Sequence, residues 1–146
     1  MDSFCADLHE AFADYRQDLE AYERSRRPAD GLLGFGRTMA NDPCHDRLDE
    51  KVKRAAEGLR AENPPPESAE EMVRLLLLRE DLSAWPVAAQ WMIRALERHA
   101  LPLIPFLTPE TAGDISRAYE QRYRRWERLP VQKQLCRALQ ERSRGK

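Results

Sequence analysis

Hydrophobic side chains recur every three or four positions along most of the chain, which is the spacing of one face of an α-helix. The pattern is clearest near the N-terminus, where the apolar residues are Cys5, Leu8, Phe12, Tyr15, Leu19 and Tyr22. This spacing predicts a helix over residues 3–26 that buries the stripe. Pro28 ends the helix, because a proline disfavours helical geometry in the residue before it.

The same spacing, read together with capping and helix-breaking residues, predicts five further helices. They cover residues 43–60, 68–79, 84–99, 109–128 and 130–142. Asn41 or Asp42 can cap the first of these, with Pro43 in the first turn, where its missing amide hydrogen costs nothing. Thr108 can cap the helix that begins at Pro109 in the same way.

The helix over 68–79 is predicted to lie at the centre of the fold. Its four consecutive leucines, residues 75–78, leave no polar face, so neighbours must cover it on several sides. Ser68 and Glu71 have the spacing of a capping box, which predicts a helix start at Ser68. The apolar connector 101–107 carries two prolines and is predicted to be buried and irregular.

The helix over 84–99 shows an apolar stripe that is expected to face the core. Its members are Ala88, Trp91, Met92, Ala95, Leu96 and His99. No segment alternates β-branched with polar residues, so we predict an all-α fold, an irregular bundle of five or six helices. The length of 146 residues suits a single domain over residues 1–146.

Several features favour a cytoplasmic protein. The longest apolar stretch, residues 100–107, has eight residues with two prolines, whereas a bilayer span needs about 20. Asp2 and Asp7 lie where a secretory signal would have a basic segment and an apolar core. Cys5, Cys44 and Cys136 are too widely spaced to indicate a disulfide framework, and a reducing compartment fits them.

Charge is balanced in total but segregated along the chain. The chain has 24 basic and 25 acidic residues, for a formal net charge of −1. Residues 1–50 carry 6 basic and 12 acidic side chains, whereas residues 101–146 carry 10 and 5. The two parts can pair within the fold or head to tail between chains. Arginine accounts for 20 of the basic residues, which is typical of a GC-rich bacterial genome.

Residues 28–42 hold three glycines and no apolar period, and they are predicted to form a loop. Polar side chains of different chemistry gather at its end and in the next helix: Arg37, Asn41, Asp42, Cys44, His45 and Asp46. A helix N-terminus after such a loop exposes backbone amides that suit an anion or a partner's carboxylate. In the alternative interpretation Asn41 and Asp42 only cap, Cys44 belongs to the core and His45 pairs with Asp49.

The His45-Asp46 doublet resembles the paired His-Asp of the HD-type metal-dependent phosphohydrolases, which are all-α enzymes. That family also has a histidine upstream and an aspartate downstream, and His9 and Asp114 lie on those sides. The resemblance implies that the four residues bind a divalent metal ion, which activates water against a phosphate ester. The glycines of the loop match neither a P-loop nor a dinucleotide-binding pattern.

The segment from Tyr119 to Arg128 interleaves aromatic residues with arginines, as a nucleic-acid-binding surface does. Tyr119, Tyr123 and Trp126 are nevertheless four and three residues apart, which is the spacing of a core stripe. The arginines, among them Arg124, would then form a solvated basic edge. Nucleic-acid binding is therefore a further alternative.

The leading prediction from the sequence is a non-catalytic protein–protein interaction module, with homodimerisation or a charged protein partner as its means of action. Amphipathic helices are abundant, and the serines show no nucleophile-elbow context. No cofactor is expected. The HD-type phosphohydrolase and the nucleic-acid-binding protein are the two alternatives.

Overall fold

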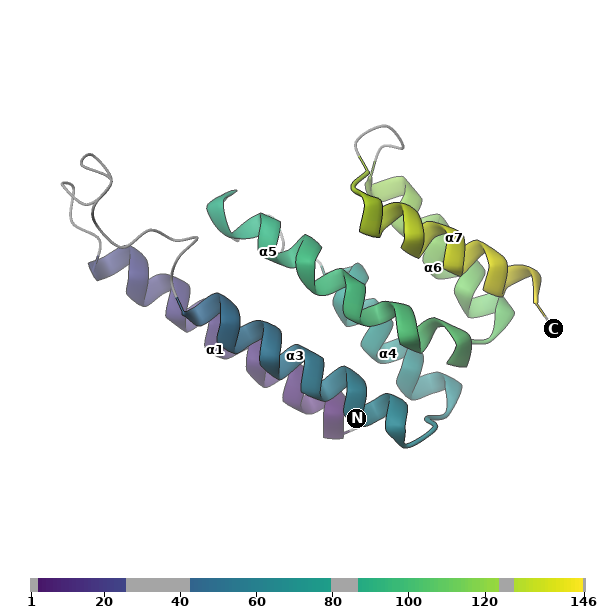
Figure 1. The fold of residues 1–146 in the computed structure, drawn as a ribbon, viewed down its shortest axis with the longest axis horizontal. Helices are drawn as coiled ribbons and strands as arrows, with labels where there is room; N and C mark the ends of the chain where they lie inside the picture. Colours follow the sequence, from purple (N-terminus) through teal and green to yellow (C-terminus); the bar gives the residue numbers. More distant parts are fainter. Residues whose placement is uncertain (1–2, 26–42, 80–86, 124–127, 146) are drawn as a thin grey trace.

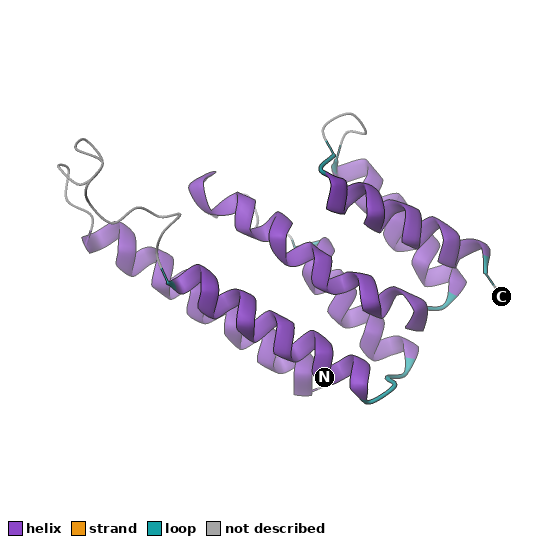
Figure 2. Ribbon diagram, in the orientation of Figure 1, coloured by secondary structure: helices purple, strands orange, loops and turns teal. Residues whose placement is uncertain are grey.

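The computed structural model describes residues 3–25, 43–79, 87–123 and 128–145. Within these ranges the fold is all-α, with helices joined by short loops and no strand (Figure 2). The prediction of an all-α helical bundle is thereby confirmed. None of the helices in the described ranges combines the length and apolar character that crossing a bilayer requires.

Six α-helices and one 3-10 helix make up the described part of the chain. In chain order they are α1 (Ser3–Ser25), α3 (Cys44–Ala61), α4 (Pro66–Leu77), α5 (Val87–Glu97), the 3-10 helix η3 (Arg98–Phe106), α6 (Pro109–Arg122) and α7 (Pro130–Arg144).

The helices are arranged as three pairs (Figure 1). α1 lies beside α3 along one side of the molecule, and α6 lies beside α7 along the other. α4 and α5 lie between these two pairs. The short η3 contacts α3, α4, α5 and α7, so it connects all three pairs.

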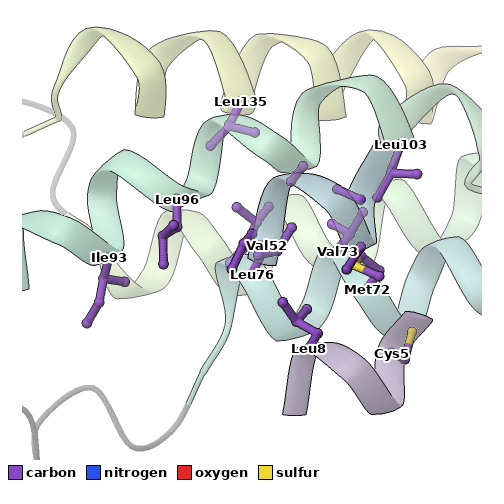
Figure 3. Close-up of a cluster of buried hydrophobic side chains, with 14 of the residues drawn as sticks. Cys5, Leu8, Val52, Met72, Val73, Leu76, Ile93, Leu96, Leu103 and Leu135 are labelled. Atoms are coloured by element: carbon purple, nitrogen blue, oxygen red, sulfur yellow. The ribbon is translucent and has the colours of Figure 1, made fainter. Parts of the chain in front are cut away.

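A continuous apolar core joins the helices. Figure 3 shows side chains from α1, α3, α4, α5, η3 and α7 turned toward a common interior. Met72, Val73 and Leu76 of α4 are at most 2% exposed, and α4 contacts α1, α5, α6 and η3. The run of leucines thus predicts the central position of α4 correctly, because an apolar helix has to be covered on several sides.

The apolar stripe of α1 is buried as its spacing predicts, and α1 packs mainly against α3. Cys5, Leu8, Phe12, Tyr15 and Leu19 are all buried. Near the N-terminal end of α1 the ring of Phe4 packs against Gly58 of α3, which has no side chain. A Cβ atom added at Gly58 would collide with the ring of Phe4. Glycine at this position therefore leaves room for an aromatic ring against the backbone of α3.

The predicted start of the central helix is wrong. α4 begins at Pro66, with Pro65 in the N-cap position, and the amide of Ser68 donates to the carbonyl oxygen of Pro65 at 3.1 Å. Ser68 is thus inside the first turn and forms no capping box. A proline at the first helical position needs no hydrogen-bond partner for its nitrogen, which lets the helix begin two residues earlier.

The connector expected to be irregular is the regular helix η3. Pro102 and Pro105 are exposed, whereas Leu103 and Ile104 are buried. A 3-10 helix has three residues per turn, so prolines three apart project on the same side. Both prolines therefore lie on the outer face, and the apolar side chains between them enter the core.

α6 is shorter than its apolar spacing predicts. The helix ends at Arg122, and Tyr123 adopts an extended backbone with φ −124° and ψ 125°. The sequence contains neither glycine nor proline at this point. The predicted continuation over residues 124–127, like residues 84–86 before α5, lies outside the described residues.

The position of Leu103 at the junction of the helices can be tested by truncation. Leu103 is fully buried, so Leu103→Ala removes packed methyl groups and leaves a cavity, which should lower the free energy of unfolding by about 2–5 kcal/mol. Leu129 is 47% exposed and provides the matched control: Leu129→Ala should change the free energy of unfolding by less than about 0.5 kcal/mol. Urea denaturation measures this free energy for both variants. Equal losses of stability would contradict the buried position of Leu103.

Candidate functional site

A carboxylate is completely buried where α5 joins η3. Glu97 is 0% exposed, and two residues from different helices hold its oxygens. Arg94, one turn earlier on α5, donates from Nη1 to Oε1 at 2.5 Å. The hydroxyl group of Tyr119, on α6, donates to Oε2. A buried charge needs such partners, because leaving water is expensive for an unpaired ion.

Tyr123 completes this cluster on the side of Arg94. The guanidinium carbon of Arg94 lies 4.3 Å from the centre of the Tyr123 ring, a cation–π contact. The rings of Tyr119 and Tyr123 meet edge to face, with their centres 4.9 Å apart. Tyr123 directly follows the last residue of α6 and has an extended backbone. The residue that leaves the helix is thus also the one that contacts Arg94. The hydroxyl group of Tyr123 is buried beside Arg94, and burial raises the pKa of this group although the charge of Arg94 lowers it.

Burial changes the acid–base properties of the cluster. Removal from water raises the pKa of Glu97 from 4.5 to about 7, although the positive charge of Arg94 and the hydrogen bond from Tyr119 both lower it. Burial also raises the pKa of Tyr119, and the negative charge of Glu97 raises it further. Tyr119 therefore stays a neutral hydrogen-bond donor, while Glu97 can gain or lose a proton near neutral pH.

α7 covers the cluster with a buried amide. Gln132 is 3% exposed and hydrogen-bonds the side chain of Tyr119. Its Oε1 also accepts a hydrogen bond from the backbone amide of Leu129 at 2.8 Å, which fixes the start of α7. The cluster thus links α5, α6 and α7 through polar contacts in an otherwise apolar interior.

A polar cavity of about 630 Å³ opens beside the cluster, between α6 and α7. We call it the basic cavity; its lining residues are Glu120, Arg128, Lys133, Cys136, Arg137 and Gln140. Its volume is in the range of small-molecule sites. Cys136 is 5% exposed, and burial raises the pKa of its thiol, so at neutral pH it is neither a thiolate nucleophile nor a negative charge.

The apolar spacing does not reveal Glu97. Of the predicted stripe, Met92 and Leu96 are buried and Ala95 and His99 are half-buried, while the side chains of Ala88 and Trp91 lie outside the description. Ile93 and Glu97 of α5 and Ala100 of η3 are buried as well. A signal was present: Glu97 follows Ile93 by four residues and precedes Ala100 by three, so it occupies a stripe position. Because glutamate is rarely fully buried, a glutamate at this position is expected on the surface.

The predicted polar loop site is only partly within the described residues. Arg37, Asn41 and Asp42 lie outside them. Cys44 is 1% exposed and belongs to the core, as the alternative interpretation expected. His45 is also buried, and Asp46 is exposed in the first turn of α3.

The predicted pairing of His45 with Asp49 is wrong. His45 Nδ1 lies 2.6 Å from the hydroxyl oxygen of Tyr15, which anchors α3 to α1. Asp49 contacts η3 instead, where its Oδ1 lies 2.9 Å from His99 Nε2 and 3.5 Å from Arg98 Nη2. Both histidines thus join helices that are distant in the sequence, which the spacing along one helix does not reveal.

The four residues of the HD-type resemblance are distributed over three helices. His9 is exposed on α1, and His45 and Asp46 lie at the start of α3. Asp114 is exposed on α6, where it pairs with Arg117 of the same helix. Over the whole described part of the chain, no three His, Cys, Asp or Glu side chains are grouped so that they could hold a metal ion.

The aromatic and basic segment predicted for nucleic-acid binding is also divided. Tyr119 is buried and Tyr123 is half-buried, so neither ring is a stacking surface. Arg122 donates from Nη1 to the backbone carbonyl oxygen of Arg79 at 2.5 Å. Arg124 and Trp126 lie outside the described residues.

The chain was compared with protein-family models, with curated proteins and with solved structures, and no match was found in any of the three.

The buried Glu97 predicts a specific pH dependence of stability. Because its pKa is higher in the folded chain, the folded state binds more protons than the unfolded state between pH 4.5 and about 7. Its stabilising contribution is therefore complete below this window and is lost as the pH rises through it. Relative to Glu97→Gln, the wild-type chain should lose about 2 kcal/mol of unfolding free energy between about pH 5 and about pH 8.

Urea denaturation at a series of pH values measures this difference. Glu57→Gln, at an exposed carboxylate on α3, is the matched control for loss of one negative charge, and it should leave the pH profile of the wild type unchanged. A Glu97→Gln profile parallel to that of the wild type would show that Glu97 does not titrate in this range.

Proposed function

We propose that this chain is a non-catalytic protein–protein interaction module that binds a second copy of itself through oppositely charged edges. One observation carries the proposal, the separation of charge across the molecule. α1 has six acidic and two basic residues, whereas α7 has four basic and one acidic. The two helices lie on opposite sides of the bundle (Figure 1), so they do not neutralise each other within one chain.

The charged side chains of both edges face solvent. On α1, Asp7, Glu10 and Glu20 are exposed. Asp14 and Asp18 form ion pairs with Lys51 and Arg47 of α3, and the nitrogen–oxygen distance is 3.3 Å in each pair.

On α7, Lys133, Arg137 and Arg144 are exposed. A second copy offers the complementary surface to each edge. A two-fold axis that brings each acidic edge to the partner's basic edge makes both contacts equivalent, which closes the assembly as a dimer.

Association of this kind is weak and sensitive to salt. Exposed ion pairs contribute about 0–1 kcal/mol each, and physiological salt screens charges beyond about 8 Å. The chain should therefore associate reversibly, at a strength set by protein concentration and ionic strength.

Sedimentation velocity at several protein and salt concentrations tests the proposal. In low salt the average mass should rise with protein concentration toward a dimer, and in high salt it should return to the 17.0 kDa of one chain. A single chain at every concentration in low salt would contradict self-association.

Charge reversal identifies the edges. Lys133→Glu with Arg137→Glu should abolish self-association, because both edges of this variant are acidic. Asp7→Lys with Glu10→Lys should do the same, because both of its edges are basic. A mixture of the two double variants should associate again, since each acidic edge of one then meets a basic edge of the other. Lys53→Glu with Arg60→Glu, on exposed positions of α3, is the control that should not disrupt association. Failure of the mixture to associate would rule out pairing of these edges.

A further inference from the structure

The basic cavity between α6 and α7 has more positive than negative charge. Among the described residues, three cationic side chains line it, those of Arg128, Lys133 and Arg137, together with the carboxylate of Glu120. Lys133 and Arg137 form no ion pair with any described residue. The described lining therefore carries a surplus of two positive charges.

The one carboxylate in the cavity does not fully compensate Arg128. Glu120 Oε1 lies 4.0 Å from Arg128 Nη1, the limit of an ion pair, and it already accepts a hydrogen bond from Gln140 Nε2 at 2.7 Å. Arg128 is only 11% exposed, and its Nη2 donates to the carbonyl oxygen of Tyr123 at 3.3 Å. Its Nε is buried with no partner in the described part of the chain. A largely buried guanidinium normally has a closer anion.

The spacing along α7 directs the lining residues to the same place. Lys133, Cys136, Arg137 and Gln140 are separated by three, one and three residues, so they share one face of the helix. The opposite face holds Leu135 and Leu139, which are fully buried and anchor α7 to the core. The cationic side chains are thus presented on a helix whose position is fixed by packing.

From this arrangement we propose that the basic cavity binds the phosphate group of a small phosphorylated molecule. A phosphate monoester carries a charge of about −1.5 to −2 at neutral pH, which matches the surplus of two positive charges. Arginine presents forked N–H donors that fit the oxygens of phosphate, and lysine adds a point charge. The cavity of about 630 Å³ exceeds the size of the phosphate group, which leaves space for the molecule that carries it.

This inference is independent of self-association, although it uses the same helix. Phosphate binding is measured at a salt concentration at which sedimentation shows a single chain at the protein concentration used. A chain that does not self-associate can still bind phosphate, and a chain that self-associates can lack the site. The two proposals therefore fail separately.

Titration with inorganic phosphate, followed by the backbone amide signals in nitrogen-15 NMR spectra at constant ionic strength, tests the site. The signals of residues 128–140 should shift and saturate. Lys133→Gln and Arg137→Gln should each weaken binding about tenfold, because each removes one charge-assisted contact. Both positions are exposed, so the variants should keep the fold, which circular dichroism checks. Arg60→Gln, an exposed arginine on α3, is the matched control and should bind as the wild type does.

Two further probes separate phosphate recognition from other attraction. Acetate at the same ionic strength should bind much more weakly, because it carries one charge and two oxygens. A single-stranded oligonucleotide without a terminal phosphate should not compete with inorganic phosphate. Absence of saturable phosphate binding, equal binding by acetate, equal loss in Arg60→Gln or competition by the oligonucleotide would each overturn the proposal.

Discussion

The packing of η3 against four other helices is the constraint on which the rest of the structure depends. Its fully buried residues, Ala100 and Leu103, hold the centre of the bundle. Glu97 immediately precedes η3, and its carboxylate is buried at the edge of this core. Burial without partners would cost several kcal/mol, and Arg94 and Tyr119 offset that cost by binding both oxygens. The polar cluster follows from the apolar packing beside it.

Tyr123, where α6 has ended, joins the polar cluster to the basic cavity. Its ring contacts Arg94 and Tyr119, and its carbonyl oxygen accepts a hydrogen bond from Arg128 Nη2 at 3.3 Å. Arg128 also lines the basic cavity. One residue thus contacts both partners of the buried carboxylate and a cation of the cavity.

α7 combines two roles because its two faces differ. Leu135, Leu139 and Gln132 fix it against the core and the polar cluster, whereas Lys133 and Arg137 remain outside. A helix held in this way fixes the backbone positions of its charges, so a ligand has to order only their side chains on binding. The exposed face of α7 thus serves both the proposed contact with a second chain and the proposed binding of a phosphate group.

The helical fold, most helix positions and the apolar stripe of α1 could be predicted from the sequence, because these depend on the spacing of side chains along one segment. The spacing also favoured an interior position for Tyr119 and offered one for Cys44 as an alternative. The burial of Glu97, the contact of His45 with Tyr15 and the gathering of cations from two segments at one cavity come from the tertiary structure. Spacing along a helix reveals which face is apolar, but the polar partner on a facing helix comes from a distant part of the chain. That partner is fixed only when the helices pack.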